Sequence, residues 1–331
     1  MSKRDESRRT KHPIVISQGE PSGIGPEVAV KAWRALKGEI SGRALRLIGD
    51  ADVFRQAAAF SNIPLSGLDS AILPTGIKVR AQAGRPSSEN AHAVTAAIAE
   101  GVRACQAGEA GALVTAPIQK SVLTAAGFGF PGHTEYLASL TGTRRAVMML
   151  ASSGMAPPLR VVPFTIHIAL SEVFGRLDAA AIAATGGVVL DALKRDFGFT
   201  NPRLAIAGLN PHAGEDGTMG REDIDIIVPA AALLRKQGHE VLGPLSADTL
   251  FHDEARKLYD AALCMYHDQA LIPIKTLAFW TGVNVTLGLP IVRTSPDHGT
   301  ALGLAGRGVA NEKSMIAAIE MAASIADRRG L

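Results

Sequence analysis

Short apolar runs alternate with longer amphipathic segments along most of this chain. Continuous apolar runs predict buried strands, and apolar residues that recur every three or four positions predict helices. The predicted strands are residues 14–17, 45–48, 112–115, 146–150, 160–164, 204–207, 261–265 and 284–287. The predicted helices are residues 26–36, 52–60, 88–106, 179–197, 224–236 and 313–326. This alternation predicts an α/β protein whose mostly parallel sheet is covered by helices on both faces.

The chain is long enough for two domains of ordinary size, since it has 331 residues. No low-complexity linker and no repeat of fixed period separates them. Two interleaved domains, with the chain leaving one and returning to it, therefore fit the pattern best. Residues 1–12 are charged and lack an apolar centre, so they predict a disordered tail and not a secretory signal.

Composition narrows the class of protein. The 34 basic and 31 acidic residues give a net charge of +3, which is too balanced to indicate binding to nucleic acid or to an anionic membrane. No apolar stretch reaches the length of about 18 residues that a transmembrane helix needs. Cys105 and Cys264 lie in apolar surroundings far apart in the sequence, which favours two buried thiols. A reducing, cytoplasmic setting is expected.

Three histidines follow predicted strands, each in a polar turn: His167, His212 and His267. Ligands of open α/β sheets bind at the carboxyl ends of the strands, and three neutral imidazoles there suit a divalent metal of the zinc or cobalt type. His167 taken singly favours a structural role, whereas His212 and His267 have polar neighbours. Asp268 either orients an imidazole or caps the following helix. The spacing of the histidines carries no information, so a metal site depends on their meeting in space.

Basic, amide and hydroxyl side chains predict an anionic substrate. Lys275 beside a metal can donate or accept a proton, or it is a solvated helix residue. Arg293 has the forked donors that match phosphate or carboxylate, or it forms a surface ion pair. Asn284 lies between them in sequence. His133 and Thr134, in the segment PGHTE, can donate to a substrate anion, or Thr134 caps a helix.

Two glycine-rich segments carry weaker signals. Residues 19–27, GEPSGIGPE, could face an anion at a helix start, but a tight strand-to-helix turn is favoured. Residues 295–306 are rich in small side chains, which suit either the approach of a flat nucleotide or close helix-to-sheet packing. The dinucleotide fingerprint, the P-loop, the zincin helix and the hydrolase elbow are all absent from the sequence.

Several sequence blocks together resemble the family of 4-hydroxythreonine-4-phosphate dehydrogenases. They are GEPSGIGPE, TAPIQK, PGHTEYLA, GLNPHAGEDGTMG, GPLSADTLF, MYHDQALIPIK, GVNVTLGLPIVRTSPDHGTAL and LAGRG. The resemblance runs from about residue 14 to the last helix. More distantly, SGIGPE and DHGTALGLAGRGVAN resemble turns of isocitrate and isopropylmalate dehydrogenases. The resemblance implies a fold like that of these dehydrogenases, with two α/β domains and a cleft between them.

The resemblance also implies a division of the chain and the roles of named residues. Residues 13–130 and 275–331 would form the nucleotide-side domain, and residues 131–274 the metal and dimer domain. The metal ligands would be His167, His212 and His267, and the substrate contacts His133, Thr134, Lys275, Asn284 and Arg293, with Lys275 as the catalytic residue. Two positions depart from the family pattern: Ala270 stands where glycine is common, and Gly303 where an acidic residue is common.

The reaction that the resemblance implies is the NAD- or NADP-dependent oxidation and decarboxylation of 4-phosphooxy-L-threonine in pyridoxal 5'-phosphate biosynthesis. It implies a divalent metal (Zn, Mg or Co) and a homodimer with the active site at the subunit interface, and no nucleic-acid or membrane partner. Three alternatives stay open: a related dehydrogenase of phosphorylated threonate, erythronate or an aromatic cis-dihydrodiol; a three-histidine metal hydrolase; and a non-catalytic metal-binding protein.

Overall fold

A computed structural model describes residues 11–331, so most of the expected tail at residues 1–12 lies outside the described residues. The chain divides into two compact units, Met1–Phe128 with Gly299–Leu331, and Gly129–His298. The expected return to the first unit at residue 275 is therefore too early. Helix α11, His267–Ala278, runs through that position, and strand β11, Val283–Leu287, pairs with β6, Val147–Ser152, of the second unit. As a result, residues 275–298 belong to the same unit as the three histidines.

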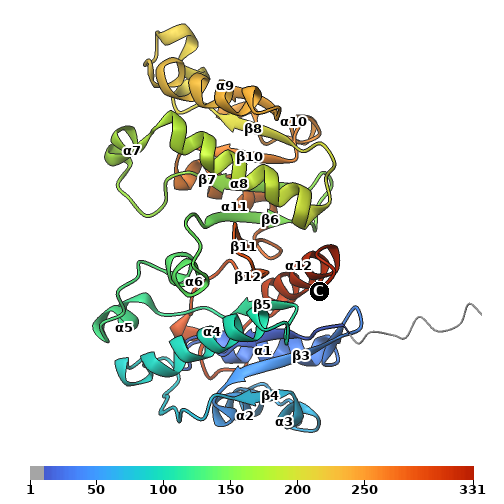
Figure 1. The fold of residues 1–331 in the computed structure, drawn as a ribbon. Coiled ribbons are helices and arrows are strands. Elements are labelled where there is room, and N and C mark those ends of the chain that lie inside the picture. Colours follow the sequence, from blue (N-terminus) through green and yellow to red (C-terminus); the bar gives the residue numbers. More distant parts are fainter. Residues whose placement is uncertain (1–10) are drawn as a thin grey trace, which may run out of the picture. The chain divides into compact units, whose positions relative to one another are not determined.

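The first unit contains a largely parallel sheet (Figure 1). Strand β1 lies between β3 and β5 and is parallel to both, β4 is parallel to β3, and the short β2 is antiparallel to β3. The strands are β1 Ile14–Ser17, β2 Glu39–Ile40, β3 Arg43–Gly49, β4 Ile72–Pro74 and β5 Ala112–Thr115. The helices are α1 Gly25–Ala35, α2 Ala51–Phe60, α3 Leu68–Ala71, α4 Ala91–Gln106, α5 Lys120–Ala125 and α12 Lys313–Arg328.

The glycines between β1 and α1 serve close packing. Gly19 has a φ of +67°, and a Cβ there would lie 2.5 Å from the carbonyl oxygen of Pro117. A Cβ on Gly23 would lie 2.9 Å from the carbonyl oxygen of Thr300. Pro26 stands in the first turn of α1, where a missing N–H costs nothing. The geometry agrees with the prediction of a tight strand-to-helix turn.

The second unit has a mixed sheet with the neighbour order β12-β11-β6-β7-β10-β8-β9. Strand β6 is antiparallel to both β11 and β7, whereas β7, β10, β8 and β9 are parallel neighbours. The remaining strands are β7 Leu159–Pro163, β8 Arg203–Ala207, β9 Glu240–Leu245, β10 Ala261–Cys264 and β12 Arg293–Pro296. The remaining helices are α6 His133–Thr141, α7 Leu170–Arg176, α8 Ala179–Phe197, α9 Val228–Lys236 and α10 Asp253–Arg256. The expected parallel sheet thus holds for four of these strands, and the antiparallel pairs around β6 differ from it.

Helices α8 and α11 pack on the sheet of the second unit. Asp178 begins α8 as predicted, since its carboxylate accepts a hydrogen bond from the N–H of Ala181 at 2.7 Å. Along α11, Ala270, Ile274 and Ala278 recur every four residues and are buried against β7 and β10.

Within residues 11–331 no individual helix has both the length and the hydropathy needed to cross a membrane. Helices α7 and α8 meet these criteria only when taken together, and the pair is bent by 95°.

Candidate metal and anion site

The three candidate histidines follow strands whose carboxyl ends lie at one edge of the second sheet. Cys264 at the end of β10 is beside Pro163 at the end of β7, and Leu263 is beside Ile206 of β8. His167, His212 and His267 come only a few residues after these ends. Parallel pairing therefore brings together three segments that are 45 and 55 residues apart in the chain, and this is the physical basis for a shared site.

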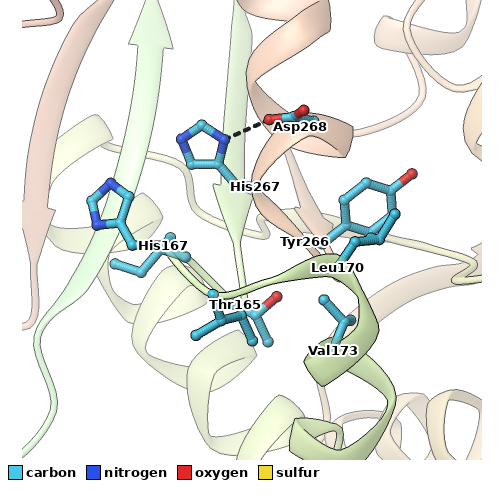
Figure 2. Close-up of a pocket in the computed structure, with 9 residues that line it drawn as sticks. Thr165, His167, Leu170, Val173, Tyr266, His267 and Asp268 are labelled. Atoms are coloured by element: carbon cyan, nitrogen blue, oxygen red, sulfur yellow. Dashed lines mark hydrogen bonds and ion pairs between the residues drawn. The ribbon is translucent and has the colours of Figure 1, made fainter.

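His167 and His267 are close neighbours, with ring centroids 5.7 Å apart (Figure 2). With metal–nitrogen bonds of about 2 Å, two imidazoles on one ion have centroids roughly 5–6 Å apart. The Oδ1 atom of Asp268 lies 2.7 Å from Nδ1 of His267, which leaves Nε2 as the ring nitrogen available to a ligand. Asp268 therefore has the geometry of a carboxylate that orients a metal-binding imidazole.

The backbone at two of the three histidines is held in the left-handed region. The φ angle is 49° at His167 and 52° at His212. The turn after β8 continues in this region, with φ of 52°, 80°, 40° and 56° at the next four residues, of which only Gly214 is a glycine. Each non-glycine residue in this conformation costs about 1–2 kcal/mol. Such strain persists where the surroundings hold it, and it is common at functional sites.

Asp223 holds the His212 turn in place. Its buried carboxylate accepts hydrogen bonds from the N–H of Leu209 at 2.8 Å and of Asn210 at 3.0 Å, and from Nδ2 of Asn210 at 3.1 Å. Asp223 was not among the residues predicted from the sequence. An acidic residue at the start of a predicted helix is typical of a cap, and nothing in the local pattern shows that it reaches 14 residues back along the chain.

His212 lies in a second pocket beside the His167–His267 pair. This pocket is lined by Asn210, His212, Ser246, Asp248, Tyr266 and Gln269, among others. Tyr266 also lines the first pocket, which contains His167 and His267, so the two pockets share this residue. Among residues 11–331, no group of three or more His, Cys, Asp or Glu side chains is gathered closely enough to hold one ion. The 167–267 pair therefore fits a divalent metal in donor type and in spacing, and His212 adds a donor of the right type next to it.

Lys275 is not a solvated helix residue, because its ammonium group pairs with Asp297. The Nζ atom lies 2.6 Å from Oδ2 of Asp297 and also donates to the Asp297 carbonyl oxygen. Burial raises the pKa of Asp297, and the charges of Lys275, His298 and His267 act in the opposite direction. Asp297 therefore connects the lysine electrostatically with the histidine edge. Asp297 was not predicted from the sequence, since the segment around it was interpreted through its small residues.

Arg293 and Asn284 lie inside the second sheet, on the antiparallel strands β12 and β11. Arg293 is only 2% exposed, which excludes the surface ion pair considered above, and its Nη1 donates to Oγ1 of Thr286 at 2.9 Å. Burial lowers the pKa of the guanidinium to about 9. The Oδ1 atom of Asn284 is buried and has no hydrogen-bond partner within residues 11–331. A buried amide of this kind is expected to meet a ligand or a water.

His133 is the first residue of α6, and the residue before it is Gly132, which has no side chain to cap the helix. Thr134 is inside the first turn and not at the capping position, so the alternative of a Thr134 cap is wrong. Both side chains belong to the second unit, at the start of a helix, where anions are favoured. They remain predicted substrate contacts.

The α/β fold resembles that of a β-decarboxylating dehydrogenase. A β-decarboxylating dehydrogenase from Thermococcus kodakarensis matches with a TM-score of 0.50 over 97% of this chain and 84% of that chain, at 16% identity. At this identity the likeness concerns the fold alone. It confirms the fold expected from the distant resemblance to isocitrate and isopropylmalate dehydrogenases.

Sequence comparison then identifies the family. Residues 43–322 match the model of the pyridoxal phosphate biosynthetic protein PdxA, and the chain belongs to this family. It is 49% identical to a 4-hydroxythreonine-4-phosphate dehydrogenase of Caulobacter vibrioides, over 97% of this chain and all of the relative. It is 50% identical to one of Paracoccus denitrificans, over 96% and 98% of the two chains. The predicted oxidoreductase of this family is thereby confirmed.

Two solved structures that resemble this chain are named for different enzyme activities. The crystal structure of 4-hydroxythreonine-4-phosphate dehydrogenase from Klebsiella pneumoniae matches with a TM-score of 0.81 at 35% identity, covering 95% of this chain and 99% of that one. A terephthalate 1,2-cis-dihydrodiol dehydrogenase from Burkholderia xenovorans matches with a TM-score of 0.64 at 29% identity, covering 95% and 98%. The first of these two structures is the more similar in both sequence and fold.

Proposed function

We propose that this protein oxidises 4-phosphooxy-L-threonine at C3 with NAD or NADP and releases CO2, giving 3-amino-2-oxopropyl phosphate for pyridoxal 5'-phosphate biosynthesis. The single observation that supports it best is the strand edge of the second unit. There, two imidazoles with centroids 5.7 Å apart lie in the same unit as a buried arginine and a lysine–carboxylate pair. Such a set matches a substrate with an oxygen to polarise and anionic groups to bind.

A divalent ion would be held by His167 and His267, with His212 as the third ligand. When bound, it supplies Lewis-acid polarisation of the hydroxyl oxygen that becomes a carbonyl. The family resemblance implies Zn, Mg or Co, and imidazole donors favour zinc or cobalt over magnesium. Because His212 is in the adjacent pocket, the complete site requires a local closing of this turn or groups supplied by a second subunit.

The remaining residues would bind and orient the substrate. Arg293, Asn284, His133 and Thr134 would hold the phosphate and carboxylate, so that the C3 hydrogen faces the nicotinamide ring. Lys275 is proposed to move the protons. As a neutral amine it would accept the hydroxyl proton while hydride passes from C3 to the nicotinamide. The resulting ammonium would stay paired with Asp297 and then return that proton to carbon after the carboxylate departs as CO2.

The proposed assembly is a homodimer in the cytoplasm, with the active site at the subunit interface and no nucleic-acid or membrane partner. A second subunit would explain why three ligands do not gather within residues 11–331 of one chain. Nucleotide contacts are proposed for the first unit, whose segment 301–306 has the small residues that a flat ring system needs.

The proposal can be tested by a turnover assay that follows reduced nucleotide by absorbance, with NAD and NADP each supplied. The panel contains 4-phosphooxy-L-threonine, phosphorylated threonate and erythronate, and an aromatic cis-dihydrodiol. We expect turnover of the first compound, and its loss in His212→Ala with the circular dichroism spectrum unchanged. Turnover of only another panel member would contradict the substrate, and full activity of His212→Ala in the presence of chelator would contradict the metal role. Phosphate release without nucleotide would indicate the hydrolase alternative.

A further inference from the structure

Two of the three turns that carry the histidines are joined by one buried glutamine, Gln269. Oε1 of Gln269 accepts a hydrogen bond from the N–H of Met265 at 2.7 Å, two residues before His267. Nε2 of the same side chain donates to the carbonyl oxygen of Gly208 at 2.7 Å, four residues before His212. Gln269 is 8% exposed, so both bonds are largely shielded from water. One amide thus fixes the distance between two turns that are far apart in the chain.

The third turn is tied to the same point. Thr165, two residues before His167, bonds to the carbonyl oxygen of Met265 through both its N–H, at 3.2 Å, and its Oγ1, at 2.8 Å. Met265 is therefore the common anchor, with its N–H held by Gln269 and its carbonyl oxygen by Thr165. A shift of the β10–α11 turn would therefore break its hydrogen bonds to Gln269 and Thr165.

From this arrangement we infer that Gln269 is a positioning residue that sets the spacing of the candidate metal ligands. The inference rests on the metal role proposed above and adds to it the group that determines the ligand geometry. The need for such a group follows from the strained backbone, because left-handed residues at 167 and 212–216 relax unless the surroundings hold them. A neutral amide suits this role, because it supplies one acceptor and one donor at fixed geometry and brings no charge that would compete with the imidazoles for the ion.

Gln269→Glu tests the inference with a nearly isosteric change. The carboxylate can still accept a hydrogen bond from the Met265 N–H. Its other oxygen faces the Gly208 carbonyl oxygen and cannot donate, so the hydrogen bond to Gly208 is lost. Asn90 offers a matched control in the first unit. It is 3% exposed, donates through Nδ2 to the Arg80 carbonyl at 2.9 Å and accepts from the Arg80 N–H at 3.1 Å. Asn90→Asp therefore removes the same kind of bond away from the histidines.

The measurement is Co(II) binding to the full-length protein by chelator competition, together with the visible absorption spectrum of the bound ion. Both variants should lower the thermal midpoint of the metal-free protein. Only Gln269→Glu should weaken Co(II) binding, by about 10–100-fold as for other residues behind metal ligands, and change the spectrum. Gln269→Met removes both hydrogen bonds without adding charge and should likewise weaken Co(II) binding and change the spectrum. It replaces Gln269→Glu in the test if the carboxylate variant does not fold.

The outcomes separate the two proposals. Wild-type protein that binds no Co(II) contradicts the metal role itself. Wild-type protein that binds Co(II), with the same affinity and spectrum in Gln269→Glu and Gln269→Met, contradicts only the positioning role of Gln269. Equal weakening in Asn90→Asp would show a general effect of lost stability and would equally overturn the inference.

Discussion

At the scale of single residues, the surroundings decide which of two roles a side chain takes. The sequence left open that Lys275 is solvated and that Arg293 forms a surface ion pair. In the structure Lys275 is paired with the partly buried carboxylate of Asp297, and Arg293 is only 2% exposed. Taking a guanidinium out of water is costly, so a buried arginine requires polar partners or an anionic ligand. Its forked donors match a phosphate or carboxylate, so Arg293 is proposed to bind a substrate anion.

Arg293→Ala should raise KM by about 10–100-fold, the size expected for lost hydrogen bonds to a charged group, with a smaller change in kcat. Arg256 is the matched control, since it is 4% exposed in the same unit and bonds to the carbonyl oxygen of Pro157. Arg256→Ala should reduce thermal stability and leave KM near the wild-type value. A loss confined to kcat in Arg293→Ala would contradict the anchoring role.

Glu20 gives a prediction about stability and pH. It is 1% exposed, and burial raises its pKa above the ordinary 4.5 although the Ser22 N–H donates to it. The charged form is therefore disfavoured in the folded state, and the wild type loses stability as pH rises from the unfolded pKa through the raised folded pKa. Glu20→Gln should remove this loss. Urea unfolding at a series of pH values from the acid range to neutrality should show a stability difference that grows with pH and then levels off; a difference independent of pH would contradict it.

At the scale of elements, the local pattern identified most of the long helices and many of the strands, and it gave no range for several short elements. The pattern predicted α8 at residues 179–197 with its Asp178 cap, because apolar periodicity and capping chemistry agree there. A helix was expected after Asp268, but the pattern gave no bounds for α11, since that helix begins with the polar residues His267 and Asp268 and contains Pro273, which ordinarily ends a helix. This helix carries both His267 and Lys275, so an element without a clear apolar pattern holds much of the candidate site.

Two adjacent glycines of α8 provide a test at this scale. A Cβ on Gly186 would lie 2.7 Å from Cδ1 of the buried Leu234, whereas a Cβ on Gly187 would meet no atom within 4 Å. Glycine inside a helix costs about 0.5–1 kcal/mol relative to alanine. Gly187→Ala should therefore stabilise the protein by about this amount. Gly186→Ala should be less stable than Gly187→Ala by about 1–3 kcal/mol, the cost of overpacking; equal midpoints in denaturant would contradict this packing of α8.

At the scale of the whole molecule, every candidate metal and substrate residue lies in the second unit, Gly129–His298. The first unit contributes a parallel sheet with tightly packed glycine turns. The chain therefore keeps the proposed metal chemistry within one continuous segment and returns to the first unit only at Gly299.

Metal removal should affect the whole molecule, because an ion that binds only the folded protein stabilises it. Dialysis against chelator should lower the thermal midpoint and abolish turnover, and added Zn²⁺ or Co²⁺ should restore both. At an ion concentration about 100 times the Kd, the gain is about 2.7 kcal/mol. His212→Ala is the control and should respond much less to added ion. An unchanged midpoint and activity in the wild type after chelation would contradict the metal role.

The sequence by itself determined the α/β class, most of the regular elements, the family and the types of side chain at the candidate site. Apolar periodicity and turn chemistry act over a few residues, so they can be read from the chain directly. Only the tertiary structure decided that β7, β8 and β10 end side by side, that Asp223 and Gln269 reach across to distant turns, and that Asp297 pairs with Lys275. These contacts join residues far apart in sequence, and their geometry depends on strand register and burial, which no local pattern encodes.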